Sequence, residues 1–122
     1  MRKDEFRALV RSTFEEIEAL TATKGEEYAA SADQLANFRR SAMEAGLTMD
    51  QVWLVFFNKH IDAIKSYSKT GRVMSEPIEG RIDDAILYLI LFKAIIQERT
   101  GIQTQIGSSA TGAGGTHPIA RG

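Results

Sequence analysis

Residues 76–96 read EPIEGRIDDAILYLILFKAII, and this stretch decides the fold. Pro77 and Glu79 are typical of a helix's first turn, because proline has no N–H to leave unpaired there and a carboxylate complements the helix dipole. From Ala85 to Phe92 no charge lies on any face, whereas a helix at the edge of a bundle buries only one stripe. We therefore predict a helix whose second apolar face is covered in a homo-oligomer.

The sequence before this stretch repeats its apolar residues at three- and four-residue steps, which is the helical period. We predict a first helix over residues 4–22, a second helix capped by Asp33 and Gly46, and a third that starts with the capping-box pair Thr48 and Gln51. Four such helices predict an all-α, four-helix antiparallel bundle. The expected inward residues are Phe6, Leu9, Val10, Thr13, Ile17 and Leu20, then Leu35, Phe38, Ala42 and Met43, then Trp53, Phe56, Phe57, His60, Ile61 and Ile64.

The composition changes after residue 98. All sixteen acidic residues lie at or before Glu98, and fourteen of the last 22 residues are Gly, Ser, Thr or Ala, with no aromatic among them. Burial of such a segment does not repay its ordering entropy. We expect a helical domain over residues 1–98 and a flexible C-terminal tail over 99–122, which is either a linker or a segment that docks on a neighbouring chain.

The overall composition excludes several classes of function. A net charge of −1 does not favour direct nucleic-acid binding or an anionic membrane, and the absence of cysteine excludes thiolate catalysis and disulfides. The longest apolar run is shorter than the roughly 20 residues that span a bilayer, and the charged N-terminus lacks a signal peptide. The common phosphate-loop and hydrolase signatures are missing. We expect a soluble, cytoplasmic protein that associates with no membrane.

Carboxylates gather at the start of the fourth predicted helix. Glu79 and Asp83 are four residues apart, so both lie on one face within a turn of each other and could share a hard cation such as Mg²⁺. Asp84 points about 100° away and completes the candidate metal set. The alternative is that the helix dipole alone favours acids in this turn.

Basic and polar residues on the other predicted helices could hold a polyphosphate. Arg39 and Arg40 offer planar forks that match phosphate oxygens, and Lys59 offers a compact charge. Asn37 and Tyr28 lie beside apolar residues and are expected to seek a base or sugar hydroxyl. The alternative for each cation is a solvated helix face.

His60 directly follows Lys59 and the aromatic run of the third predicted helix. An imidazole with an unperturbed pKa of about 6.5 could be a ligand, a phosphate partner or a general base. A buried-edge histidine with a structural role is the alternative. His60 and Lys59 are the candidate catalytic residues.

Five short motifs appear in a characteristic order within a region of about residues 10–96. They are Lys24-Gly-Glu-Glu-Tyr28, Asn37-Phe-Arg-Arg40, Asn58-Lys-His-Ile61, Glu76-Pro-Ile-Glu79 and Asp84-Ala-Ile-Leu-Tyr88. Their order resembles the phage and bacterial nucleotide modification associated domain family, which is related to MazG-like all-α nucleoside triphosphate pyrophosphohydrolases.

The resemblance implies a MazG-like, often oligomeric helical domain that handles nucleotides. In active relatives it implies Mg²⁺-dependent cleavage of a (d)NTP between the α and β phosphates, here in the host cytoplasm if the protein is phage-encoded. By position, the residues that match the family pattern are Lys24, Glu27, Tyr28, Asn37, Lys59, Glu76, Asp84 and Tyr88.

The chain departs from the family pattern at its acidic positions. Gly80 stands where an acid is expected one turn before Asp84, and Asn58 stands where relatives tend to have Asp. The hydrolases' EExxE helix has no clean counterpart, since the acids at residues 15–18 have the wrong spacing. Fewer carboxylates would weaken Mg²⁺ binding and hydrolysis more than nucleotide binding. A nucleotide-binding or sequestering module and a phage structural or assembly protein are therefore the alternatives.

Overall fold

The computed structural model describes residues 1–27, 33–72 and 77–101, and within these ranges the chain forms four α-helices and no strand. The helices are α1 (Lys3–Glu27), α2 (Ala36–Ala45), α3 (Met49–Thr70) and α4 (Ile78–Thr100). The all-α, four-helix prediction is confirmed. Residues 102–122 lie outside the described part of the chain, so the predicted tail stays a prediction.

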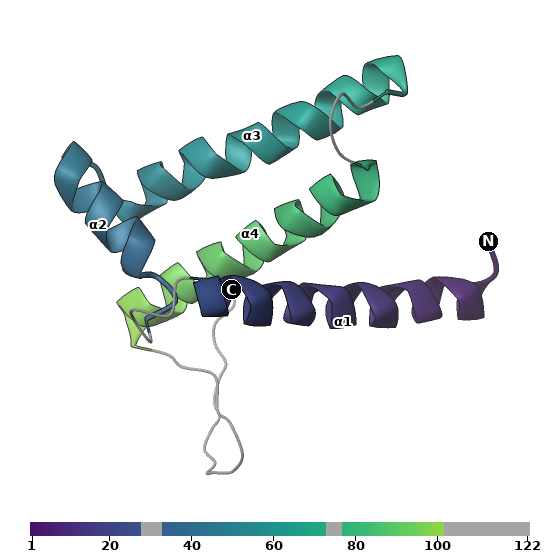
Figure 1. Cartoon of the computed structure of the whole chain (residues 1–122), viewed down its shortest axis with the longest axis horizontal. Coiled ribbons are helices and arrows are strands. Elements are labelled where there is room, and N and C mark those ends of the chain that lie inside the picture. The colour runs from purple at the N-terminus through teal and green to yellow at the C-terminus, as the bar shows by residue number, and fades with distance from the viewer. Residues whose placement is uncertain (28–32, 73–76, 102–122) are drawn as a thin grey trace, which may run out of the picture.

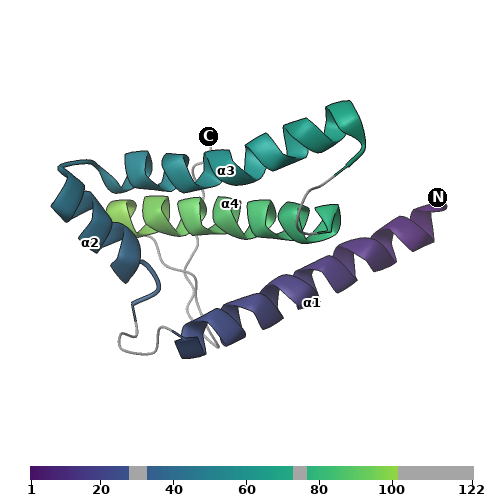
Figure 2. The same cartoon turned by 45° about the horizontal axis from the view of Figure 1, so that its top comes forward.

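The helices form an open bundle. α3 and α4 pack antiparallel along most of their length, and the short α2 crosses the end of this pair where α3 begins (Figure 1). Among the described residues, the backbone of α1 approaches only α4. Figure 2 shows that α1 runs in the same general direction as α4 but at an angle to it, so the two helices do not stay side by side along their lengths. In the described part of the chain, no helix combines the length and apolar character needed to cross a bilayer.

Local signals set most helix ends as the sequence predicts. The backbone N–H of Gln51 donates to Thr48 Oγ1 at 3.1 Å, and the N–H of Thr48 donates to Gln51 Oε1 at 2.9 Å, so the capping box is confirmed. Gly46 ends α2 with φ of 70°, a left-handed conformation that glycine adopts without a Cβ penalty.

Two predicted boundaries are wrong. Asp33 does not cap α2, because that helix begins at Ala36; the Asp33 carboxylate instead accepts from the backbone N–H of Leu35 at 3.0 Å and holds the turn before the helix. α1 continues five residues beyond the predicted end, to Glu27. It passes through Gly25, which costs a helix interior only about 1 kcal/mol relative to alanine.

The core lies where α2, α3 and α4 meet. Trp53 stacks between Phe57 and Phe92, with ring centroids 4.7 and 4.4 Å away, and its Nε1–H donates to the Tyr88 carbonyl at 2.6 Å. The buried cluster around it consists of Leu35, Phe38, Ala42, Val52, Trp53 and Ile95. Met43, predicted to face inward, is instead 82% exposed. Phe38 and Ala42 form the buried face of α2, and Met43 lies about 100° around the helix from Ala42, so its side chain points to solvent.

The predicted inner stripe of α1 is only partly buried. Ile17 is buried, whereas Phe6, Leu9 and Val10 are exposed, which corrects their assignment to the core. The reason is that α1 diverges from α4 toward its N-terminus (Figure 1), so no described element covers those turns. The apolar run of α4 is likewise exposed at Leu89. Its covering by a second copy stays a prediction.

Candidate functional site

Four of the predicted site residues come from the middle of the α3–α4 pair. The imidazole of His60 on α3 lies against the phenol ring of Tyr88 on α4, with ring centroids 4.8 Å apart. Lys59 precedes His60 and places its Nζ 5.6 Å from the Phe56 ring centroid. Asp84 lies one turn before Tyr88 on the same side of α4. We call Lys59, His60, Asp84 and Tyr88 the α3–α4 site.

An aromatic cluster borders the α3–α4 site. The Phe38 ring of α2 meets the rings of Phe56 and Tyr88 edge to face, with centroids 6.2 and 6.3 Å away. These contacts hold Tyr88 half-buried between three helices. The sequence predicts Phe38 and Phe56 as core residues from their helical spacing, but it does not reveal that they border the site, because that depends on how α2 crosses the pair.

The predicted metal ligands divide between two sides of α4. Glu79 and Asp83 lie four residues apart on one side, and Asp84 lies about 100° around the helix. Asp83 and Asp84 are half-buried and Glu79 is exposed. Within the described ranges, no three or more His, Asp or Glu side chains are grouped closely enough to hold an ion. Two carboxylates together with phosphate oxygens would still match the hard donors that Mg²⁺ prefers.

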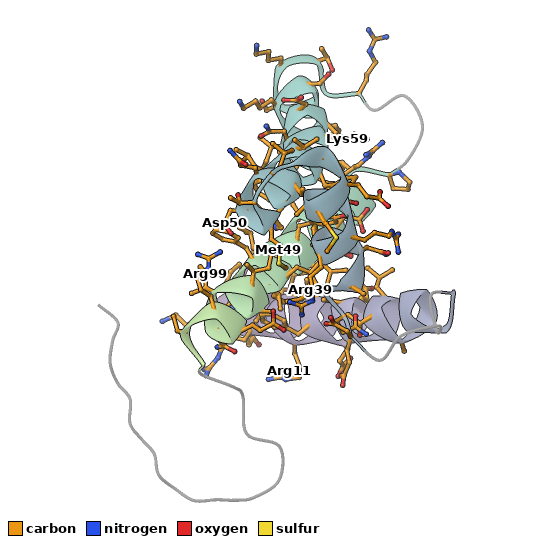
Figure 3. All side chains as sticks on the ribbon, turned by 90° about the vertical axis from the view of Figure 1, so that its left-hand side faces the viewer. Arg11, Arg39, Met49, Asp50, Lys59 and Arg99 are labelled. Carbon is orange, nitrogen blue, oxygen red and sulfur yellow. The ribbon has the colours of Figure 1, made fainter. Side chains whose placement is uncertain are left out.

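Arg39 is engaged at the opposite end of α4. Its Nε donates to Asp33 Oδ2 at 2.8 Å, and its Nη2 donates to Glu98 Oε2 at 2.6 Å. Glu98 follows Asp84 by 14 positions, about 21 Å along the helix at 1.5 Å per residue. Figure 3 accordingly shows Arg39 well apart from Lys59. The structure therefore does not bring Arg39 to the α3–α4 site.

The ion pairs of Arg39 change the protonation equilibria of its partners. Hydrogen bonds from its guanidinium lower the pKa of Glu98 and, together with the Leu35 N–H, the pKa of Asp33. The same bonds raise the pKa of Arg39 itself. All three side chains are partly exposed, so the network links the segment before α2 to the end of α4 with modest strength.

The other predicted nucleotide-binding residues on α2 pair with each other. Arg40 Nη2 donates to Asn37 Oδ1 at 2.9 Å, and both side chains are exposed. A comparable pair joins Arg99 to Asp50 beside the core (Figure 3). Both pairs lie on the surface, where such pairs orient the side chains but add little to the free energy of unfolding.

Three predicted site residues fall in or beside the gap between α1 and α2. Lys24 and Glu27 belong to the last turns of α1, but their side chains lie outside the described residues, as does Tyr28. Glu76, between α3 and α4, also lies outside the described residues. Their roles therefore stay predictions.

Comparison of the chain with known protein families, curated proteins and solved structures finds no match.

Proposed function

We propose that this protein is a Mg²⁺-dependent nucleoside triphosphate pyrophosphohydrolase that binds its substrate at the α3–α4 site. The observation that carries the proposal is the packing of His60 against Tyr88, with Lys59 and Asp84 within about one turn of that contact. Lys59 supplies a cation for an anionic polyphosphate, and the half-buried rings of Phe56 and Tyr88 supply apolar surface for a base.

The reaction requires a water molecule to attack the α-phosphorus while the bond to the bridging oxygen of the β-phosphate breaks. The products are a nucleoside monophosphate and pyrophosphate. His60 is the proposed general base for the water, and Lys59 neutralises phosphate oxygens. Tyr88, with Tyr28, Asn37, Lys24 and Glu27, is proposed to contact base or sugar.

The proposed metal ligands are Glu79, Asp83 and Asp84. Mg²⁺, when bound, would neutralise charge that develops on the phosphates. Because these acids lie on two sides of α4, a substrate phosphate is needed to complete the set. Arg39 is left out of the proposal, since Asp33 and Glu98 already bind its guanidinium.

A nucleotide-binding module without turnover is the second candidate. Gly80 occupies the position where an acid is expected one turn before Asp84, and the described residues contain no group of three metal-binding side chains. A site of this kind could retain Lys59 and the aromatic cluster for binding while it loses the metal-dependent step.

The test combines pyrophosphate release and melting temperature over a panel of (d)NTPs with and without Mg²⁺. We expect pyrophosphate from at least one nucleotide and a Mg²⁺-dependent rise in melting temperature. Asp84→Asn should lower kcat by about 100-fold or more, and Lys59→Gln should raise KM about tenfold. Lys65→Gln, an exposed lysine later on α3, is the matched control and should change neither parameter.

The outcomes separate the two candidates. A nucleotide-dependent rise in melting temperature without pyrophosphate would favour the binding module. Neither effect with any nucleotide would contradict both. Full activity in Asp84→Asn would contradict the assignment of the α3–α4 site as the active site, even if the protein proved to be a hydrolase.

A further inference from the structure

The outer face of α4 carries a heptad pattern that the described helices leave largely exposed. Starting at Glu79, the pattern steps alternately three and four residues along the helix, which is the spacing of a coiled-coil seam. All seven of its positions are exposed or half-buried, and Leu89 is 52% exposed. The buried residues Leu87 and Ile95 lie on the other side of the helix. We call this set the α4 seam: Glu79, Ile82, Ile86, Leu89, Lys93, Ile96 and Thr100.

Charge is divided along the α4 seam. Glu79 and the adjoining Asp83 lie toward its N-terminal end, whereas Lys93 lies toward its C-terminal end and is the only charged residue from Ala85 to Gln97. The helix dipole favours this order, but none of the three charged side chains forms an ion pair within the described residues. A face with acids at one end, a base at the other and an apolar middle is complementary to a copy of itself turned end for end.

We propose that α4 pairs antiparallel with α4 of a second copy of this chain, with Ile86 opposite Leu89 of that copy. In a coiled coil, each seam side chain enters a hole formed by four residues of the facing helix. In this register the hole that receives Lys93 offers two carboxylates to its ammonium group. The hole is formed by Glu79, Ile82, Asp83 and Ile86 of the second copy.

The same charges disfavour a parallel pair. Equivalent seam positions face each other in a parallel coiled coil, so Lys93 would face Lys93 of the second copy and Glu79 would face Glu79. Like charges placed opposite each other oppose association. Charge does not select a second copy for α1 in this way, because the exposed apolar residues of that helix lie in its basic N-terminal part.

The α4 seam lies on a different side of α4 from the α3–α4 site. Tyr88 contacts His60 on α3, whereas the next residue, Leu89, lies about 100° around the helix. The pairing therefore does not rest on the proposed function. Glu79 and Asp83 are also proposed metal ligands, so bound Mg²⁺ would compete with Lys93 of the second copy for them. The dimer is accordingly measured in EDTA.

The size of the α4 seam predicts a weak, salt-sensitive dimer. Its seven residues and their flanking side chains are fewer than the roughly 20–30 residues that each partner contributes to a standard interface. We therefore expect a dissociation constant on the order of 10–100 micromolar at low salt. Because Lys93 pairs with carboxylates, this constant should rise with ionic strength.

Sedimentation equilibrium of the whole chain in EDTA tests the charge pairing. Lys93→Glu should raise the dimer dissociation constant about tenfold, because a carboxylate then enters the acidic hole. Glu79→Lys and Asp83→Lys together should have a similar effect, and the triple variant should return the constant to within about threefold of the wild type. Lys65→Glu, at an exposed position on α3, makes the same change in net charge as Lys93→Glu and should leave the constant unchanged.

Two outcomes of this experiment would overturn the proposal. One is a wild-type chain that stays monomeric to several hundred micromolar, which would leave residues 102–122 of the same chain as the candidate cover of the seam. The other is a triple variant that dimerises more weakly than Lys93→Glu. Circular dichroism of each variant should report the helix content of the wild type.

A second measurement tests which helix forms the contact. Leu89→Ser should abolish the dimer, because this side chain lies at the centre of the seam. Leu54→Ser is the matched control, since Leu54 is 49% exposed on α3, and it should leave the dimer intact. The reverse result would place the contact on α3 and overturn the proposal.

The direction of the pair is tested with a nitroxide label on Thr100→Cys, which is the only thiol because the chain has no cysteine. In the antiparallel register the two labelled positions are about 25 residues apart, or about 37 Å along the helix axis. In a parallel pair they would lie side by side, within about 15 Å. Pulsed electron paramagnetic resonance should therefore give a long distance, and the short one would overturn the antiparallel register. None of these readouts depends on nucleotide turnover, so the dimer and the proposed function can fail separately.

Discussion

At the residue scale, Trp53 joins α3 to α4 through ring stacking and a hydrogen bond. It stacks on one ring from each helix, and its Nε1–H binds the Tyr88 carbonyl. The same carbonyl belongs to the residue whose side chain contacts His60. Trp53 therefore sets the spacing of the pair at the level of the α3–α4 site.

Truncation of Trp53 is expected to be severe. Trp53→Ala removes two ring contacts and the hydrogen bond from the indole N–H to the Tyr88 carbonyl, so we expect a loss of about 3–5 kcal/mol in the free energy of unfolding. Urea denaturation followed by circular dichroism measures it. Val55→Ala, at an exposed position on the same helix, should cost about 0.5 kcal/mol or less. Equal losses in both variants would contradict the packing described for Trp53.

A second residue-scale prediction concerns Arg39 and pH. In Arg39→Gln, the pKa of Glu98 should rise toward 4.5 and that of Asp33 toward 3.8, because the hydrogen bonds that lower them are lost. Carboxyls with a lowered folded-state pKa stabilise the fold above their unfolded pKa, and this stabilisation disappears as pH falls through the folded value. The variant should therefore lose less stability than the wild type on acidification below about pH 5.

Carbon-13 NMR titration of the two carboxyls measures the pKa change directly. Arg40→Gln is the matched control, because Arg40 binds Asn37 and neither carboxyl. Unchanged titration of Glu98 in Arg39→Gln would show that the ion pair across α2 and α4 does not form in solution.

At the scale of elements, short-range signals determined what could be predicted. The start of α3 follows from the reciprocal bonds of Thr48 and Gln51, and the end of α2 follows from Gly46. The exposure of Met43 and the true start of α2 could not be predicted the same way, because they depend on the angle at which α2 crosses its neighbours. Asp33 carries an N-cap signal, but its carboxylate binds Leu35 and Arg39.

The capping box gives an element-scale prediction. Thr48→Ala removes the side-chain acceptor for the Gln51 N–H, and we expect a loss of about 0.5–2 kcal/mol in the free energy of unfolding. Thr48→Ser keeps the hydroxyl and should retain most of the stability. Thermal denaturation of the two variants gives the comparison. If Thr48→Ala were as stable as Thr48→Ser, the start of α3 would not depend on this cap.

At the scale of the whole molecule, periodicity predicted the number and type of the helices but not their arrangement. The apolar stripe of α1 predicts a buried face but not the helix that covers it. Among the described residues, α4 covers this stripe at the turn around Ile17 and leaves its N-terminal part exposed.

The candidate site shows the same division. The contact between His60 and Tyr88 is compatible with the sequence, because antiparallel α3 and α4 bring their middles side by side. That Lys59 and Asp84 act with them stays a prediction. Arg39 could not be excluded from sequence, since its partner Glu98 lies 59 positions away along the chain. The position along the α3–α4 pair at which α2 crosses determines which carboxylate of α4 Arg39 can reach.

The most direct test of the proposed site maps binding residue by residue. Nitrogen-15-labelled protein would be titrated with Mg²⁺ and a (d)NTP analogue whose α,β bridge is a non-hydrolysable methylene group. We predict saturable amide shifts centred on residues 58–61 of α3 and 84–88 of α4. Saturable shifts centred on α1 or on the Arg39–Glu98 pair, or no shifts at millimolar analogue, would contradict a nucleotide site between α3 and α4.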